Sequence, residues 1–301
     1  METLIIDIPC KVGDEFNITP YTDLHDDAAS CAHNILHEHM QRRAALPNAR
    51  FLSLGDMANL VLPGPDKRST PSAMVDLLDE AIEQIQSSKL SDAEKLIAIT
   101  SIRKEYRERE SDALIDLLVD RQIERYQQYP WLFLGTGNHC TAALKHHFTH
   151  VTKRVCDRLN IPYGGYSGIA RLRFNIPNRD GHAKLTILYH HGAWSGQVIK
   201  GLGGAKRWAA GFDEWDVCLY GHNHQLHLHE EPKVRMSARG VLEHRDVYIA
   251  NCGTFLKGYR QGGSADYGEQ RGYPAVSLNA PLMTIRITSD GYKFQISLGD
   301  V

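Results

Sequence analysis

The sequence predicts an α/β protein. Strand-like and helix-like segments alternate along its 301 residues, and we find no internal repeat and no low-complexity linker. That length suits one large domain or two small ones, and we expect one, over residues 1–301. The composition, 42% hydrophobic and 23% charged, is ordinary for a globular chain that buries a core.

The first segments read as strand, strand, helix, strand. Residues 2–9 and 15–24 carry the apolar pattern of strands, and a helix is expected at about 27–46, ending before Pro47. The apolar run FLSLGD at 51–56 predicts a short strand that enters a loop.

Residues 69–129 read as a helical insertion between two strands. Ser69-Thr70-Pro71 is a helix start, and Ser91 with Glu94 forms a capping-box signature for a second helix. A third helix follows within the same region. This insertion contains no histidine, so we expect it to shape access to a site without supplying ligands.

The second half returns to strands. WLFLGTGNH, after Pro130, is strand then loop, and a hairpin is expected around Asp180-Gly181. A helix near 198–211 leads to the strand DVCLY and the loop GHNH. A final hairpin is expected over Asp290-Gly291.

Charge and cysteine usage exclude several classes of protein. The formal net charge of −2 gives no global attraction to nucleic acid or to an anionic membrane, so such binding must be local. No apolar run approaches the roughly 20 residues of a spanning helix, and the first residues lack a signal-peptide pattern. Six scattered cysteines without a C-x-x-C pair predict buried thiols and a cytoplasmic protein with no membrane partner.

Polar motifs follow the apolar strands, where an α/β sheet places its active site. Their donors are two carboxylates, one amide oxygen and four imidazoles, a set without thiolate that suits Mn²⁺, Fe or Zn²⁺. Seven ligands are too many for one catalytic ion with an open position, and they suit two ions that share a carboxylate and act together on a phosphoryl group. The candidate ligands are Asp23, His25, Asp56, Asn138, His190, His222 and His224.

The motif order D-x-H, G-D, G-N-H, H, G-H-x-H resembles the calcineurin-like metallophosphoesterases over residues 23–224. This resemblance implies a two-sheet β-sandwich flanked by helices, the four-layer metallophosphoesterase fold. The tracts GDMANLVLPGPDKR, YHHG and GTFLKGY also resemble phosphoesterases encoded in phage genomes.

The resemblance also implies a role for each ligand. Asp56 would bridge two divalent ions, with Mn²⁺ expected first and Fe, Zn²⁺ or Ni²⁺ as alternatives. His139 would be a catalytic histidine beside the phosphate that binds no metal. The first ion would be held by Asp23, His25 and His224, and the second by Asn138, His190 and His222.

The sequence departs from the family pattern at two positions. Asn59 stands where the family usually has the second Asp of G-D-x-x-D, and Cys140 stands where an acid usually follows G-N-H. The second change removes the acid that normally orients or charges this histidine, which weakens the expectation that His139 is a strong proton donor. The family's V-x-x-H spacing, measured from Ile187, selects His190 as the ligand and leaves His191 as a substitute or neighbouring group.

Basic residues near the motifs are candidates for substrate contact. Lys67 and Arg68 follow the Asp56 loop, while Lys206 and Arg207 follow a glycine-rich connection. Solvated positions on a loop and a helix are the simpler reading of both pairs. The same choice holds for His146, His147 and His150, which follow the G-N-H loop.

Together these features predict a hydrolase in which a metal-activated hydroxide attacks phosphorus. The partner we expect first is a phosphodiester, in nucleic acid or a nucleotide. The alternatives are a phosphomonoesterase acting on a nucleotide or phosphoprotein, and a binding module whose metal site is structural.

Overall fold

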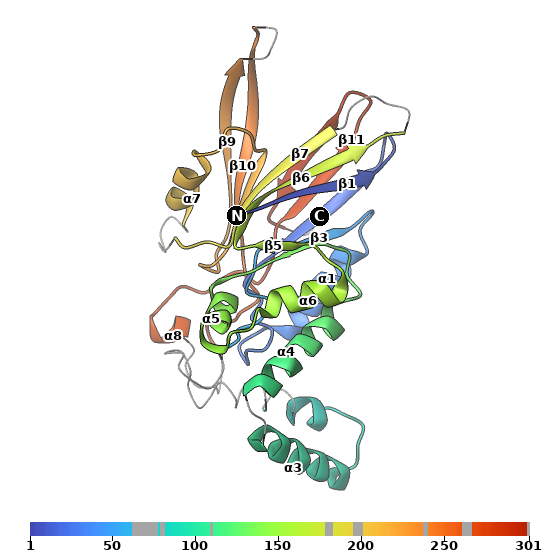
Figure 1. Ribbon diagram of the computed structural model, residues 1–301, viewed down its shortest axis with the longest axis vertical. Coiled ribbons are helices and arrows are strands. Elements are labelled where there is room, and N and C mark those ends of the chain that lie inside the picture. Colours follow the sequence, from blue (N-terminus) through green and yellow to red (C-terminus); the bar gives the residue numbers. More distant parts are fainter. Residues whose placement is uncertain are drawn as a thin grey trace.

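Two six-stranded sheets stack face to face and carry helices on their outer faces (Figure 1). This arrangement is seen in the computed structural model, which describes residues 1–61, 78, 82–108, 111–177, 183–194, 201–236, 240–260 and 267–299. The two-sheet sandwich flanked by helices that the motif order predicts is confirmed.

The first sheet mixes parallel and antiparallel strands. The β6–β7 and β9–β10 pairs are antiparallel, while β1–β6, β7–β8 and β8–β10 are parallel. The expected hairpin of β6 and β7 is therefore present, although its turn at Asp180-Gly181 lies outside the described residues. In spatial order the strands are β1 (Glu2–Pro9), β6 (Ser167–Asn175), β7 (Ala183–His190), β8 (Val217–Tyr220), β10 (Leu242–Cys252) and β9 (Leu226–Met236).

The second sheet is parallel except at one side. β2, β3, β4 and β5 run parallel, so the loops that leave their carboxyl ends meet at one edge. β11 pairs antiparallel with β2 and with β12, which confirms the final hairpin. The order is β12 (Tyr292–Ser297), β11 (Leu282–Ile287), β2 (Glu15–Tyr21), β3 (Arg50–Ser53), β4 (Trp131–Gly135) and β5 (Tyr163–Gly165).

The core between the sheets is built from alternate residues of facing strands. Phe133 of β4 stacks on Tyr189 of β7 with ring centroids 4.7 Å apart, and Phe16 of β2 meets Phe174 of β6 at 5.3 Å. Aromatic pairs contribute about 0.5–1.5 kcal/mol beyond the area they bury. These contacts fix how the two sheets face each other, and hence how their loops meet.

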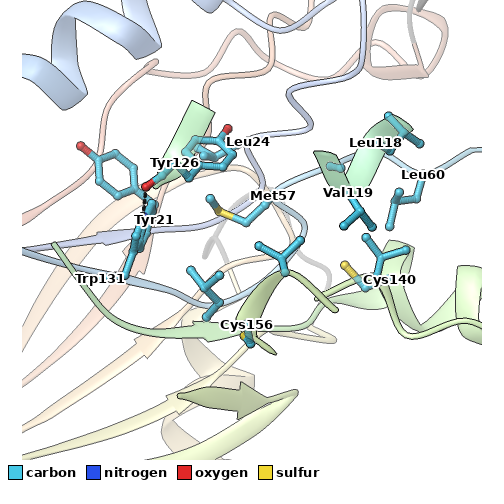
Figure 2. Packing of buried hydrophobic residues seen from close by; sticks show 14 of the residues in the cluster. Tyr21, Leu24, Met57, Leu60, Leu118, Val119, Tyr126, Trp131, Cys140 and Cys156 are labelled. Atoms are coloured by element: carbon cyan, nitrogen blue, oxygen red, sulfur yellow. Dashed lines mark hydrogen bonds between the residues drawn. The ribbon is translucent and has the colours of Figure 1, made fainter. Parts of the chain in front are cut away.

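Helices complete four layers. α7 (Leu202–Ala209) covers the outer face of the first sheet, where Leu188 and Tyr220 are buried. The second sheet is covered by α1 (His33–Ala44), α4 (Ser111–Tyr126), α5 (Asn138–His147) and α6 (Val151–Leu159). Figure 2 shows this outer core, with Leu118 and Val119 of α4 near Cys140 of α5. The short helix α8 spans Tyr267–Gln270. None of the helices in the described part of the chain is long and apolar enough to cross a bilayer.

The 69–129 region divides into two parts. α3 (Asp92–Glu108) lies away from the sheets in Figure 1, and its capping box is present, since Ser91 N–H donates to Glu94 Oε2 at 2.9 Å. α4, in contrast, contributes Leu114 and Leu118 to the buried core. The predicted helix start at Ser69 lies outside the described residues.

The helix expected at 27–46 begins later, at His33. The two acidic residues after His25 stay in a loop because their carboxylates hold other parts of the chain. Asp26 Oδ2 accepts from the Tyr126 hydroxyl of α4, and Asp27 Oδ2 accepts from the Leu60 N–H at 3.0 Å.

Candidate metal centre

The predicted ligand loops meet at the carboxyl ends of strands from both sheets. The loops after β2 and β3 are joined by backbone hydrogen bonds: the N–H groups of Asp23, His25 and Asp26 donate to the carbonyls of Gly55, Asp56 and Met57. The loops after β4, β7 and β8 complete the cluster. This convergence results from the shared strand direction, because each motif directly follows its strand.

One group of donors contains Asp23, His25 and His224. The Nε2 atoms of the two histidines lie 3.3 Å apart, and Asp23 Oδ1 lies 3.5 Å from His224 Nε2 and 3.9 Å from His25 Nε2. The donor atoms of all three residues lie within 4.8 Å of one another. Asp23 and His25 are buried, so a cation between these donors would be held away from bulk water.

A second group surrounds His191. Its Nε2 lies 3.1 Å from Asp56 Oδ2 and 3.0 Å from Asn138 Oδ1, and the same Asn138 oxygen lies 2.8 Å from His222 Nδ1. Asp23 Oδ1, 3.9 Å from His191 Nε2, connects this group to the first. The two groups therefore overlap at the two carboxylates.

The structure places His191, and not His190, among these donors. Side chains alternate along β7, and Ile187 and Tyr189 face the space between the sheets while Leu188 faces α7. His190 continues the α7 side: its ring packs against Trp194, and its Nδ1 accepts the Gly192 N–H at 2.8 Å. The V-x-x-H spacing selects His190, whereas the structure brings His191 to Asp56 and Asn138, so we propose His191 in place of His190 as the ligand.

Five of the candidate ligands adopt left-handed backbone conformations. The φ angles are 50° at Asp23, 46° at His25, 48° at Asp56, 74° at His222 and 59° at His224. Such conformations are uncommon for residues other than glycine and cluster at functional sites, where the surrounding structure compensates their cost. The folded chain thus keeps these donors directed inward at an energetic cost.

Two motif glycines allow the loops to approach. A Cβ on Gly221 would lie 2.5 Å from Asp23 Oδ2, and one on Gly137 would overlap the Asp56 carboxylate. Glycine is therefore required at positions 137 and 221, because one ligand loop packs closely on another there.

Buried charges dominate the electrostatics of the cluster. Burial raises the pKa values of Asp23 and Asp56, but the neighbouring histidines, of which His191 has the largest effect, together outweigh burial and hold both pKa values well below the usual range. Burial lowers the pKa of His191, while Asp56 and Asp23 raise it to about 9. Burial, followed by the charges of His139 and His224, lowers the pKa of His25. The two carboxylates thus stay ionised and require positive charge beside them.

Unsatisfied polar atoms show that the cluster suits cations. Within the described residues, Asp23 Oδ1 and His25 Nδ1 are buried side-chain atoms without a hydrogen-bond partner, and Asp56 Oδ2 lies 3.1 Å from His191 Nε2 without a well-aligned hydrogen bond. A buried acceptor left unpaired costs about 1–3 kcal/mol, and more when it is charged. Divalent ions beside the two carboxylate oxygens would remove that cost, so these residues fit the metals that their chemistry implies.

His139 lies beside the donors and is oriented by a backbone carbonyl. Its N–H donates to Asp56 Oδ1 at 3.0 Å, and its Nδ1 meets the Asn59 carbonyl oxygen. A carbonyl only accepts, so Nδ1 carries a hydrogen and Nε2 is the nitrogen available for proton transfer. The ring lies 4.6 Å from that of His25, centroid to centroid.

Asp27 holds the loop that supplies this carbonyl. Its carboxylate is only 8% exposed and accepts the backbone N–H groups of both Asn59 and Leu60. Leu60 has φ 51°, another left-handed conformation. Asn59 stands out in the sequence as a departure from a motif, whereas the role of Asp27 does not, and its one signal is the acidic pair Asp26-Asp27 directly after the D-x-H motif.

Cys140 does not take over the role of the usual acid. It is buried under α4, and burial, with Asp56, raises the pKa of its thiol to about 11. It therefore stays a neutral thiol and packs in the core.

The other predicted substrate contacts differ in position. Lys206 Nζ is paired with Glu231 Oε2 of β9 at 2.8 Å. Arg207 is exposed on α7. Lys67 and Arg68 lie outside the described residues, and His150 meets the Tyr163 hydroxyl at 3.0 Å.

Comparison with protein-family models finds no match, and neither does a search of curated proteins. Among solved structures, Vps29 from Chaetomium thermophilum is similar, with a TM-score of 0.30 and 10% identity over 95% of this chain and 98% of that one. A metallophosphoesterase from Sphaerobacter thermophilus has a TM-score of 0.30 and 13% identity, over 94% and 89% of the two chains.

Proposed function

We propose that this protein is a metal-dependent phosphoester hydrolase with a two-metal centre. The observation that carries the proposal is the pair of overlapping donor groups, in which two buried carboxylates face imidazoles from four loops. Oxygen and nitrogen donors without thiolate suit Mn²⁺, Fe or Zn²⁺, and Mn²⁺ is the ion to test first.

The proposed ligand set follows the contacts. Asp56 would be the ligand shared by both ions, since it forms donor groups both with His25 and His139 and with Asp23 and His191. In each group, buried carboxylate oxygens supply the negative charge that a divalent ion requires. The first ion would be held by Asp23, His25 and His224, and the second by Asn138, His191 and His222.

When bound at these residues, two divalent ions would supply charge neutralisation at the phosphoryl oxygens and a nucleophilic water near neutral pH. The chain itself supplies the acid. His139, with Nδ1 committed to the Asn59 carbonyl, presents Nε2 for a proton that the departing oxygen needs. An alkyl leaving group needs that proton, whereas nitrophenolate is already stable as an anion. Phosphodiesters of nucleic acid or nucleotides are the proposed substrates.

The test measures bound metal and turnover together. Protein loaded with Mn²⁺ is expected to hold two ions per chain, to hydrolyse nitrophenyl diesters faster than monoesters, and to lose activity on chelation. Asp56→Asn is expected to lower the rate at least about 100-fold, above the 10- to 100-fold typical of residues that only support a ligand. An active preparation with one ion per chain would refute the two-metal proposal.

A matched pair of histidines controls for general damage. His191→Ala is expected to lose one ion and most of the activity. His190→Ala, one residue away but packed against Trp194, is expected to keep both ions. Equal metal loss in the two variants would mean that the cluster is not the metal site.

A further inference from the structure

The chain that leaves the metal cluster at Asn138 is basic and free of acids. Residues 138–156 contain no Asp or Glu, although the whole chain has more acidic than basic side chains, 36 against 34. Lys145, Lys153 and Arg154 lie in this stretch, and Arg154 is paired with Asp116 of α4. A local excess of positive charge is what a phosphate backbone requires from a protein whose net charge is negative.

Helical periodicity puts part of this charge on the same face as the metal ligand. In α5, Cys140 and Ala143 are buried against the outer core. Asn138, Thr141 and Lys145 follow one another at spacings of three and four residues, so they share a face, and Thr141 and Lys145 are exposed. This row leads from the donor groups to the end of the helix.

An exposed aromatic ring ends the row. Phe148 follows α5 in a left-handed conformation with φ 54°, and it is 90% exposed, the largest exposed fraction among the large hydrophobic side chains described. Leu144, one turn earlier, is 39% exposed. Since α5 has 10 residues and rises 1.5 Å per residue, Phe148 lies about 15 Å along the helix from Asn138.

We propose that the exposed row of α5, defined by Thr141, Leu144, Lys145 and Phe148, binds single-stranded nucleic acid a few nucleotides from the phosphate at the metals. Lys145 contacts the backbone, and a base stacks on the Phe148 ring, the combination by which proteins hold single strands without reading sequence. This inference rests on the proposed function and names its substrate class. An acidic peptide would use the lysines but offers no planar group for Phe148.

Binding is measured without turnover, by fluorescence anisotropy of a labelled oligothymidylate with protein kept in a chelator. Phe148→Ala is expected to weaken binding about 10- to 100-fold, the range for loss of one stacked base. Lys145→Ala is expected to lower the slope of log affinity against log salt by about one. Met236→Ala, 73% exposed at the end of β9 and outside the row of α5, is the matched control and should change neither quantity.

Turnover separates this inference from the metal chemistry. Phe148→Ala should keep wild-type activity on a nitrophenyl diester, which is too small to reach the ring, and should raise the KM for an oligonucleotide. Unchanged oligonucleotide affinity in Phe148→Ala, or equal competition by polyglutamate, would overturn the inference and leave the hydrolase proposal standing. Oligonucleotide binding without hydrolysis of any ester would overturn the hydrolase proposal instead.

Discussion

Replacing Asp27 by Asn tests how the structure orients His139. In the wild-type protein each carboxylate oxygen of Asp27 accepts one backbone N–H group, from Asn59 and from Leu60. The change keeps the shape of the side chain but leaves only one acceptor oxygen for these two N–H groups. The new amide nitrogen would face an N–H group. We therefore expect the loop at 59–60 to shift and the Asn59 carbonyl to leave the His139 Nδ1 hydrogen.

The magnitude follows from the lost contacts. One buried N–H without a partner costs about 1–3 kcal/mol. Divided by the unfolding entropy of a 301-residue chain, this loss of unfolding free energy lowers the Tm by about 2–5 °C. A general acid contributes about 10²- to 10⁴-fold, so hydrolysis of an alkyl diester should fall by about 100-fold or more. Hydrolysis of the matched nitrophenyl diester should change little.

The assay compares the two esters in Mn²⁺-loaded protein and counts bound metal. Asp26→Asn is the matched control, because the neighbouring carboxylate binds Tyr126 and lies 3.4 Å from Arg125 Nη1, both of α4. It should lower the Tm without altering the ratio of the two rates. In Asp27→Asn, an equal loss on both esters, or loss of a metal ion, would refute orientation of His139 through the Asn59 carbonyl.

Three further outcomes are expected. Gly137→Ala should abolish binding of at least one metal, because its Cβ would overlap the Asp56 carboxylate; a variant that folds and holds both ions would contradict this. Replacing α3 by a short linker should keep both ions, as measured by metal analysis, since α3 supplies none of the donors. Removing α4 as well should unfold the protein, because Leu114 and Leu118 are core residues. His139→Ala should slow alkyl diesters far more than nitrophenyl diesters, and equal losses would assign it to phosphate positioning.

Much of the fold was predictable because it depends on local patterns. Apolar runs at strand spacing identified most of the strands, and turn residues located the hairpin over Asp290-Gly291. The capping box at Ser91 was visible as well. Each of these signals lies within a few residues of the structure that it determines, so it can be recognised from the sequence alone.

The donor chemistry was also visible in the sequence, but its final selection depended on side-chain direction. Motifs after strands identified six of the seven residues that the structure brings together, counting His191 in place of His190. The choice between those two histidines depends on which face of β7 borders the other sheet. Which face borders the other sheet is decided by the packing of strands that are distant in sequence, so residue spacing along one segment does not predict it.

Only the tertiary structure decided which loops contact one another. Asn59 acts through its backbone carbonyl, which the identity of its side chain does not reveal, and Asp27 reaches it from a loop after another strand. α4 looked like part of a separable insertion, yet its apolar face closes the core over the second sheet. The sequence by itself determined which donors exist. The stacking of two sheets, which brings five loops to one edge, determined where each donor points.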